Sequence, residues 1–314
     1  MRRQAESPSS RTTLPRVLDA GWFNKLVIVA CALSWGSSFV VMKDVTAQFS
    51  TFWLLFIRFG LSSLVMLAVF RRQVLANVRP DVVRVGVVLG VLYGLAYVFQ
   101  TYGIVFTTPG KNAFLTGVYC VLVPFCAWAL GHGKPTRVSV IAAFVSLVGM
   151  GFVVLDNGLP LNVGDLLTLV AAVFFALEMV VVAHEGRDKD VWALTFWQFL
   201  TIAGMTLVGA LLFERPPAVS LFTPDTTMRL AFLILVCSFG CLAGLNYALT
   251  RVDPAAGSLL SSLESPSGVA VSVMLGYEAL TPKLVLGFVL IFAGITFSEL
   301  GERIVLALPR CRRS

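Results

Sequence analysis

Hydrophobic residues in this chain form long runs instead of alternating with polar residues. The runs contain about 18 to 24 mostly apolar positions each, and short polar stretches with glycine and proline separate them. A helix crossing the hydrocarbon core of a bilayer, about 30 Å thick, needs roughly 20 residues. The pattern predicts ten transmembrane helices, at residues 27–45, 52–70, 82–105, 112–131, 138–156, 164–184, 191–213, 229–249, 256–277 and 284–304.

Composition supports an all-α integral membrane protein. Hydrophobic residues make up 57% of the 314 positions and charged residues 13%, and the mean hydropathy is +0.86. A soluble domain cannot bury that much apolar surface. Ten spans leave almost no room for a soluble domain, so outside them we expect a polar N-terminal tail at 1–25 and a basic C-terminal tail at 305–314.

The basic residues predict the orientation in the membrane. If the N-terminus is cytoplasmic, 18 of the 24 Lys and Arg fall in cytoplasmic loops and tails, 5 fall outside, and Arg58 lies within a span. Inner loops of membrane proteins carry this excess of basic residues. We therefore expect a multi-pass protein of the cytoplasmic (inner) membrane with both termini inside. The net charge of +7 arises from these loops and does not indicate nucleic-acid binding.

The chain contains an internal repeat. The stretch Gly90–Tyr97 in the third span and the stretch Gly240–Tyr247 in the eighth are identical at five of eight positions. Pro124 in the fourth span corresponds to Pro266 in the ninth. We interpret residues 27–156 and 164–304 as two copies of a five-helix unit.

An odd number of spans per copy means that the second copy is inverted in the membrane. Inverted repeats are typical of alternating-access transporters, whose sites lie near the midplane where broken helices expose backbone polar groups. We expect Pro124 and Pro266 to mark such breaks. The glycines recur every four residues on one helix face, which favours close helix packing over direct solute contact; they are Gly86, Gly90, Gly94, Gly240 and Gly244.

Three ionisable residues lie well inside spans, where a charge is costly unless it is paired or hydrated. Arg58 is a candidate to bind a solute carboxylate, with a structural ion pair or snorkelling as the alternative. Glu178 lies in an apolar stretch that favours the neutral acid, so it either couples transport to protons or is a structural group. Glu264 precedes Pro266 in a serine-rich stretch that begins at Ser258, and we favour a cavity role for it.

Other polar or amphipathic residues in the spans are candidates for the wall of a solute pocket. They are Trp35, Tyr97, Gln100, Asn112, Tyr119, Asn246 and Tyr247. Glu278, at a span end, suits a capping or gate role. The two histidines, His132 and His184, fall in predicted cytoplasmic loops and form no metal-ligand pattern, and the cysteines lack CxxC spacing. We expect no metal site, no cofactor and no catalytic set.

Several stretches, in this order and spacing, resemble the EamA-type ten-helix branch of the drug/metabolite transporter superfamily. They are Trp35–Phe39, Arg58, Asn112–Gly117 with Pro124, Gly164–Asp165, Leu263–Pro266 and Gly276–Glu278. The resemblance implies a bundle with a central cavity lined by spans 1, 3, 4, 6, 8 and 9, and export of metabolites, amino acids or drugs, often coupled to protons. The chain departs from the family where Ser265 separates Glu264 from Pro266. It also has Gly131–Lys134 where the family has a glutamate after the fourth span.

The sequence therefore predicts a secondary transporter that exports a small organic metabolite, either an amino acid or an amphipathic drug-like solute. Its expected partners are the solute, the lipid bilayer and protons as coupling ion. A channel or a lipid-handling membrane protein is the alternative, because serine and glutamate side chains also suit a pore. No oligomeric state follows from these patterns.

Overall fold

The computed structural model describes residues 21–154, 162–252, 260–277 and 279–307. Helices account for nearly all of these residues, which contain no strand. The elements are α1 (Gly21–Thr46), α2 (Thr51–Val69), α3 (Arg71–Ala76), α4 (Pro80–Phe106), α5 (Pro109–Gly117), α6 (Tyr119–Ala129), α7 (Arg137–Val154), α8 (Val163–Glu185), α9 (Val191–Phe213), the 3-10 turn η2 (Val219–Leu221), α10 (Pro224–Ala231), the π-helix η3 (Phe232–Gly240), α11 (Cys241–Leu249), α13 (Glu264–Met274) and α14 (Pro282–Ala307).

Seven helical segments in the described part are long and apolar enough to cross a membrane. They are α1, α2, α4, the pair α5 and α6, α8, α9, and the continuous run from α10 through α11. These seven correspond to predicted spans one to four and six to eight. Helices α7, α13 and α14 lie at the other three predicted positions, with shorter apolar stretches at Val140–Gly149 and Val285–Gly294. The chain is therefore a multi-pass membrane protein, and the count of ten stays a prediction.

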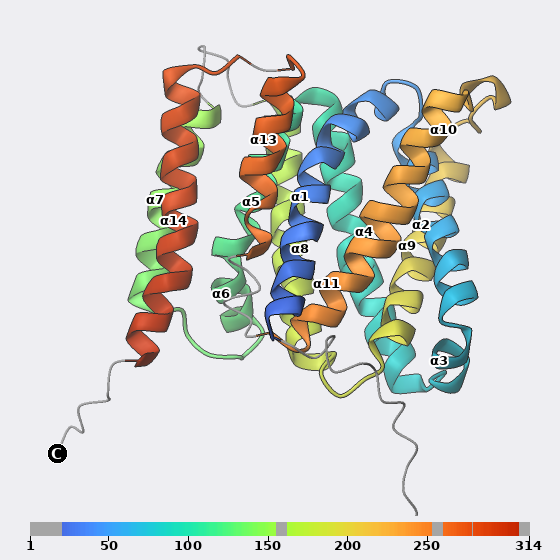
Figure 1. The fold of residues 1–314 in the computed structure, drawn as a ribbon, viewed down its shortest axis with the longest axis horizontal. Helices are drawn as coiled ribbons and strands as arrows, with labels where there is room; N and C mark the ends of the chain where they lie inside the picture. Colours follow the sequence, from blue (N-terminus) through green and yellow to red (C-terminus); the bar gives the residue numbers. More distant parts are fainter. Residues whose placement is uncertain (1–20, 155–161, 253–259, 278, 308–314) are drawn as a thin grey trace, which may run out of the picture.

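The helices run alternately up and down between two ends of the molecule (Figure 1). At the upper end, Lys43 near the end of α1 binds the Thr107 carbonyl after α4, and the Thr107 hydroxyl binds Asp165 at the start of α8. At the lower end, Phe70 after α2 stacks on Trp192 at the start of α9. Helix α1 therefore ends where α8 begins, and the two run in opposite directions.

Contacts between the two halves come in matching pairs. The contact of α1 with α11 corresponds to the contact of α8 with α4. The contact of α2 with η3 corresponds in the same way to that of α9 with α4. The contact of α1 with α13 likewise corresponds to that of α8 with α6. In three further contacts the two partners are equivalent elements of the two halves: α2 with α9, α5 with α13, and α7 with α14. Exchanging the two halves reproduces each of these contacts, as expected for two related units of opposite direction.

The fourth span is broken, although not at its proline. The break lies at Val118, between α5 and α6, whereas Pro124 lies inside α6. In the ninth span Pro266 lies in the first turn of α13, where its missing N–H is tolerated. Helix α13 begins only at Glu264, after a turn at Ser262 and Leu263. In both spans the break therefore precedes the proline that led us to expect it.

The eighth span contains an irregularity without an obvious sequence signal, the π-helix η3. Its wider turns place carbonyls where side chains of neighbouring helices reach them. The Trp35 indole donates to the Cys237 carbonyl at 2.7 Å, and the Ser62 hydroxyl donates to the Ile234 carbonyl at 3.1 Å. Segments of this kind often occur at functional sites.

The glycine stripe of α4 packs against α9. A Cβ atom at Gly86, Gly90 or Gly94 would lie 2.4–2.5 Å from a side-chain atom of Trp197, Thr201 or Met205 respectively, one turn apart on α9. In the second half Gly244 approaches α1, where an added Cβ atom would lie 3.1 Å from Cγ1 of Val27. Gly240 differs: it is exposed and meets only a carbonyl of its own helix segment, so the packing expected for it is absent among the described residues.

Candidate solute-binding site

Two adjoining cavities lie at the centre of the helix bundle. Their free volumes are about 30 and 10 Å³, which is room for only a few water molecules. Trp35, Tyr97, Gln100 and Glu264 line both cavities. The larger also contacts Tyr93, Thr116, Tyr119, Phe175, Glu178, Met179 and Leu245, and the smaller Ser38, Phe39, Met42, Arg58, Thr101, Ile104 and Asn112. The centre is closed around a space smaller than an organic solute.

Close helix crossings hold the broken helices at this centre. Ser265 of α13 donates to the Ala113 carbonyl of α5 at 3.1 Å. A Cβ atom at Gly117 would lie 1.9 Å from the Ser265 hydroxyl, and one at Gly268 would lie 2.6 Å from the Ala113 Cβ. Since only glycine permits this approach, these residues set the position of the α13 N-terminus and of its first residue, Glu264.

Arg58 of α2 is a buried cation, with 1% of its surface exposed. Its Nε donates to the Ser238 hydroxyl at 2.5 Å and its Nη2 to the Tyr97 hydroxyl at 3.2 Å. The guanidinium carbon also lies 4.6 Å from the centre of the Tyr97 ring. No Asp or Glu of the described residues forms an ion pair with Arg58. Neither the structural ion pair nor the snorkelling considered above is found, and the cation faces the smaller cavity.

Glu178 of α8 is held by a chain of amides. The Gln198 side chain of α9 donates to Glu178 Oε1 at 2.8 Å, and Asn246 of α11 donates to Gln198 Oε1 at 3.0 Å. Asn246 also donates to the Thr195 hydroxyl at 3.0 Å. Glu178 lines the larger cavity. Asn246 itself lies behind that wall and orients Gln198.

Glu264 lines both cavities and is 9% exposed. Its carboxylate has no hydrogen-bond or ion-pair partner in the part of the chain that the structure describes. Two of the neighbouring serines bind the backbone instead: Ser265 donates to the Ala113 carbonyl, and Ser267 donates to the Glu264 carbonyl at 2.9 Å. Ser258 lies outside the described residues. Glu264 is thus a buried acid whose oxygens face the cavity unpaired.

Asn112 of α5 joins the smaller cavity to α8. Its Nδ2 donates to the Thr168 hydroxyl at 2.7 Å and to the Gln100 carbonyl at 3.3 Å. Its Oδ1 is buried and has no hydrogen-bond partner among the described residues. The Gln100 side chain donates to the Thr116 hydroxyl at 3.0 Å. An unpaired amide oxygen at a cavity wall is available to accept a hydrogen bond from a solute.

Aromatic rings form much of the larger cavity. Tyr97 and Phe175 meet edge to face with centroids 5.6 Å apart, and Tyr93 meets Phe175 in the same way at 5.2 Å. Tyr119 of α6 lies 6.2 Å from Phe175. Edge-to-face packing leaves ring faces and edges turned to the cavity, a surface that suits the apolar part of an amphipathic solute.

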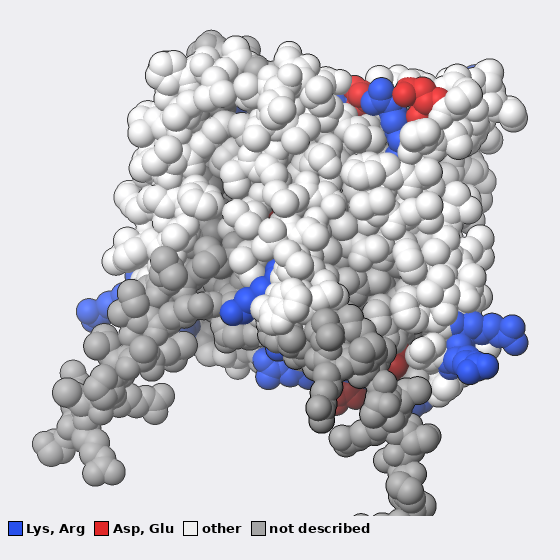
Figure 2. Space-filling model, viewed as in Figure 1, with Lys and Arg blue, Asp and Glu red and all other residues white. Residues whose placement is uncertain are grey.

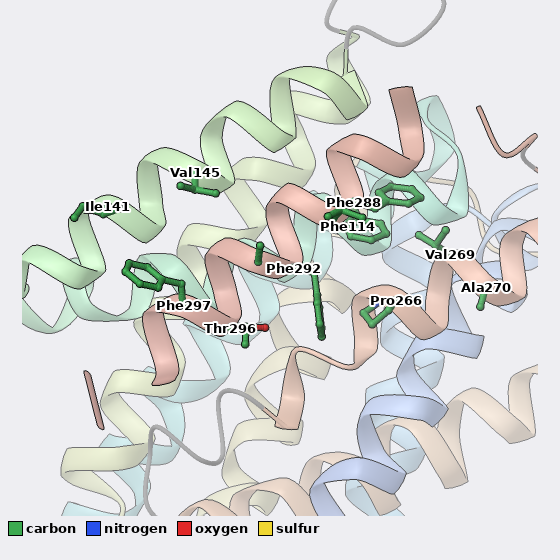
Figure 3. A pocket seen from close by; sticks show the side chains of 12 residues that line it. Phe114, Ile141, Val145, Pro266, Val269, Ala270, Phe288, Phe292, Thr296 and Phe297 are labelled. Atoms are coloured by element: carbon green, nitrogen blue, oxygen red, sulfur yellow. The ribbon is translucent and has the colours of Figure 1, made fainter. Parts of the chain in front are cut away.

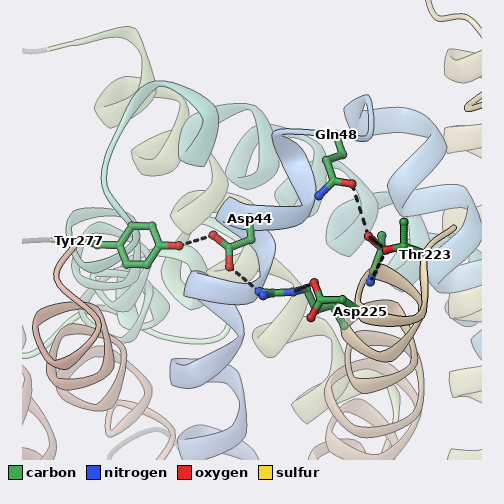
Figure 4. A network of polar contacts seen from close by, with 7 residues as sticks. Asp44, Gln48, Thr223, Asp225 and Tyr277 are labelled. Atoms are coloured by element: carbon green, nitrogen blue, oxygen red, sulfur yellow. Dashed lines mark hydrogen bonds and ion pairs between the residues drawn. The ribbon is translucent and has the colours of Figure 1, made fainter. Parts of the chain in front are cut away.

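A polar network closes the upper end of the molecule (Figure 4). Asp44 of α1 accepts from Arg229 of α10 and from the Tyr277 hydroxyl between α13 and α14. Arg229 also donates to Asp225 at 2.8 Å. The bond to Asp44 raises the pKa of the Tyr277 phenol. These contacts tie α1, α10 and the α13–α14 connection together, above the central cavities.

The lower end instead contains an open vestibule of about 590 Å³. It is lined by Phe70, Gln73, Arg187, Lys189, Asp190, Val191, Trp192, Tyr247, Thr250 and Arg251. Tyr247, which we expected at a central pocket wall, lies here instead. Its neighbour Asn246 points toward Gln198 because successive residues of a helix face directions about 100° apart.

A fourth hollow, of about 1080 Å³, opens between α7, α14 and the broken helices (Figure 3). Phe114 of α5 stacks on Phe288 of α14 with centroids 3.6 Å apart at one side of it. Its lining is apolar apart from Thr296. None of its described lining residues is charged, and its apolar walls fit the hydrocarbon surroundings of the helices.

The histidines lie together at the lower end. The rings of His132, after α6, and His184, at the end of α8, stack with centroids 3.7 Å apart. The sequence places them in separate loops and contains no sign of this contact. No group of three or more His, Cys, Asp or Glu among the described residues is placed to hold a metal. Glu278, our candidate for a gate, lies outside them.

Sequence reasoning missed four residues of the site: Gln198, Ser238, Tyr93 and Phe175. Gln198 carried a usable signal, because it is a lone amide in the middle of an apolar span. Ser238 carried a weaker one, as a hydroxyl eight positions before Asn246. Tyr93 lies one turn before Tyr97 on the same face of α4, which predicts that both face the cavity.

Comparison with known proteins identifies relatives. The sequence pattern of the EamA-like transporter family matches residues 23–155 and again residues 162–299. An uncharacterized transporter of Archaeoglobus fulgidus is 27% identical over 277 residues, 88% of this chain and 85% of its own. A second uncharacterized transporter of that organism is 26% identical over 237 residues, 73% of this chain and 80% of its own.

A crystal structure of a similar protein has the same fold. It superposes with a TM-score of 0.67 at 19% identity and covers 90% of this chain and 98% of its own. The family match covers most of the chain in two copies, which confirms the resemblance expected from the sequence. Family and relatives both indicate a transporter and not an enzyme. The chain belongs to the EamA-like transporter family.

Proposed function

We propose that this protein is an alternating-access secondary transporter that exports a small zwitterionic solute, an amino acid or a close analogue, across the cytoplasmic membrane. One observation carries the proposal. Arg58 and Glu264 are buried, line the same cavity and have no ionic partner in the described part of the chain. A buried charge is costly unless it is compensated. A solute with a carboxylate and an ammonium group supplies both missing partners.

The proposed topology is ten spans in two inverted units, 27–156 and 164–304. The matched helix contacts of the two halves and the double family match support it. Most of the basic side chains visible in Figure 2 gather along the lower edge, with a few acidic groups among them, whereas acidic and basic groups lie together in one cluster at the upper edge. Since cytoplasmic faces carry the excess of Lys and Arg, we place the lower end, where α1 begins and α14 ends, in the cytoplasm.

The conformation supports inward-facing access. The Asp44 network ties the upper end together, while the vestibule opens the lower end. In the proposed cycle the solute enters from the vestibule, and the upper network then opens while the lower end closes. The small volume of the central cavities means that this change must also part the aromatic rings around them.

We place the coupling proton on Glu264. Its carboxylate lines the cavity without a partner, so it can hold either a proton or the ammonium of the solute, but not both at once. Glu178 is the second candidate, although its bond to Gln198 already satisfies one oxygen. Exchange at Glu264 would link inward proton movement to outward solute movement.

Flux measurements in proteoliposomes test the proposal. Labelled amino acids are compared with their methyl esters, which lack the carboxylate, and their N-acetyl forms, which lack the ammonium, with and without an inward-acid gradient. Saturable flux of the zwitterions alone is expected. Glu264→Gln should abolish the effect of the gradient, whereas Glu185→Gln, at an exposed position on α8, should leave it unchanged.

Other outcomes point to other functions. If the esters and the N-acetyl forms are transported as fast as the zwitterions, the zwitterion assignment is overturned. If the gradient affects Glu264→Gln as it affects the native protein, the coupling role is overturned. Ohmic current would indicate a channel. Movement of lipid instead of solute would indicate a lipid-handling protein, for which the apolar groove beside α14 provides the surface.

A further inference from the structure

We propose that the vestibule at the lower end is an oxyanion-binding site that collects the carboxylate of the solute before it reaches Arg58. The inference rests on the proposed function, because it treats the vestibule as the cytoplasmic entrance. At about 590 Å³ the vestibule is large enough for a small organic molecule, unlike the central cavities.

The charges of its lining favour an anion. Arg187, Lys189 and Arg251 are basic, and Asp190 is the one acidic residue among the lining groups. Asp190 is already committed to the start of α9, where its Oδ1 accepts from the Ala193 N–H at 2.9 Å. The N-terminal end of this 23-residue helix also opens at the vestibule and carries a partial positive charge.

Arg187 is the basic group available to a ligand. No Asp or Glu of the described residues forms an ion pair with it, and its side chain is exposed. The other two cations have protein contacts: Lys189 donates to the Glu185 carbonyl at 2.8 Å, and Arg251 donates to the Tyr247 carbonyl at 3.0 Å. We therefore expect Arg187 to make the main contact, with Lys189 and Arg251 contributing to the field.

The aromatic residues of the vestibule form part of its wall and stack on one another, so their stacked faces are not available to a ligand. Phe70 stacks on Trp192 at 4.0 Å, and Trp192 stacks on Tyr247 at 5.5 Å. Arg251 covers the Tyr247 ring, with 3.6 Å between the guanidinium carbon and the ring centre. Because these ring faces contact one another or Arg251, the vestibule selects its ligand by charge and not by stacking. Its ligand class is therefore small carboxylates, both with and without an aromatic ring.

The vestibule adjoins the inner site through α11. Tyr247 lies in the vestibule wall, while its neighbour Asn246 begins the amide chain that leads to Glu178. A carboxylate thus meets Arg187 at the entrance and the unpaired Arg58 at the centre. Two cations at successive depths give an anionic group a favourable position at each stage of entry.

Binding of benzoate and benzamide tests the site, since the two probes share their shape and differ in charge. Affinities are measured by saturation-transfer NMR on the full-length protein in zwitterionic phosphatidylcholine nanodiscs. We expect benzoate to bind and benzamide not to. Arg187→Gln should weaken benzoate binding about threefold to fivefold, the size typical of a partly exposed charge pair. Arg84→Gln, an exposed arginine at the same end outside the vestibule, is the control.

Two further arms separate the sources of the anion and the two proposals. If adding phosphatidylglycerol weakens benzoate binding to the native protein but not to Arg187→Gln, the oxyanion is a lipid headgroup phosphate; without competition it is the solute carboxylate. In flux assays Arg187→Gln should raise KM and leave Vmax unchanged. Equal binding of benzamide, or equal effects of Arg187→Gln and Arg84→Gln, would overturn the site. If the native protein binds benzoate but transports none of the tested solutes, only the proposed function is overturned.

Discussion

At the scale of single residues, the centre of this transporter is defined by charges that the protein does not neutralise. Arg58 is held by a serine hydroxyl and a tyrosine hydroxyl, and Glu264 lacks a partner among the described residues. Glu178, in contrast, is bound by Gln198. Dipoles and ring faces stabilise a buried cation less than a carboxylate does, so Arg58 retains the capacity to bind an anionic group.

Substitution of Arg58 should therefore impair recognition of the solute carboxylate. We expect Arg58→Gln to raise KM for zwitterions about tenfold or more, the effect of losing a charge-assisted hydrogen bond. Arg58→Lys keeps the charge but loses the planar guanidinium group, so its KM should lie between those of the native protein and Arg58→Gln. Initial rates in proteoliposomes provide the measurement. Ser63→Ala, which removes a hydroxyl bonded only within α2, is the control, and equal KM values in all four proteins would exclude the role.

The ionisable site residues could be predicted because a charge in an apolar run is conspicuous, while their partners depend on rotation about the helix axis. Asn246 and Tyr247 are adjacent in sequence, yet one orients Gln198 and the other lines the vestibule. Without the register of α11 against α9, the sequence cannot assign either direction. The stacking of His132, in the loop after α6, on His184, in the last turn of α8, joins distant parts of the chain and had no local signal.

At the scale of elements, small residues decide how closely the helices approach. Along α4, three glycines spaced by four residues meet three side chains spaced by four residues on α9. Packing of this kind brings backbones together where no hydrophobic effect drives association in lipid. The stripe holds α4, which carries Tyr93, Tyr97 and Gln100, at a fixed distance from α9, which carries Gln198.

Gly90→Ala should consequently destabilise the bundle. A Cβ atom there would lie 2.5 Å from the Thr201 Cβ and 2.8 Å from the Gln198 carbonyl oxygen, and overpacking of this kind costs about 1–3 kcal/mol. Gly204→Ala is the matched control, because no atom lies within 4 Å of its added Cβ. It should be neutral or stabilising by up to about 1 kcal/mol, since alanine favours helix. Thermal unfolding in detergent compares them, and similar midpoints would contradict the packing role.

The elements themselves followed from the apolar runs, but the exact places of their irregularities did not. The seven spans lie where 20-residue runs predict them, because length and hydrophobicity suffice. The break at Val118 and the π-helix η3 depend instead on tertiary contacts. Trp35 and Ser62 donate to η3 carbonyls from other helices, and these bonds are invisible in the local sequence.

At the scale of the whole molecule, the two ends differ in a way that the repeat alone does not predict. Both halves share a fold, yet charged side chains tie the upper end together and the lower end contains the vestibule. The network joins α1 of the first half to α10 of the second and to the α13–α14 connection. In the proposed alternating-access cycle the two halves exchange this asymmetry, so the network would contribute directly to the energy difference between the two states.

Asp44→Asn should shift the population toward the state open at the upper end. The change removes the charge that holds Arg229 and weakens the bond from Tyr277 while preserving size. Loss of about 1 kcal/mol from one state changes a two-state ratio about fivefold. The readout is the reaction rate of Ser38→Cys, which lines the smaller cavity, with a membrane-impermeant thiol reagent added from outside to a cysteine-free background. We expect that rate to rise about fivefold.

Asp225→Asn separates the gate from a general charge effect. Asp225 binds the same arginine, but both lie on α10, so losing this contact leaves the link to α1 in place. It should leave the labelling rate of Ser38→Cys within twofold of the parent protein. If Asp225→Asn accelerates labelling as much as Asp44→Asn, surface charge and not the tie between the halves controls access. If neither variant changes the rate, the upper end is closed by helix packing alone, and the aromatic rings around the central cavity become the barrier that the cycle must open.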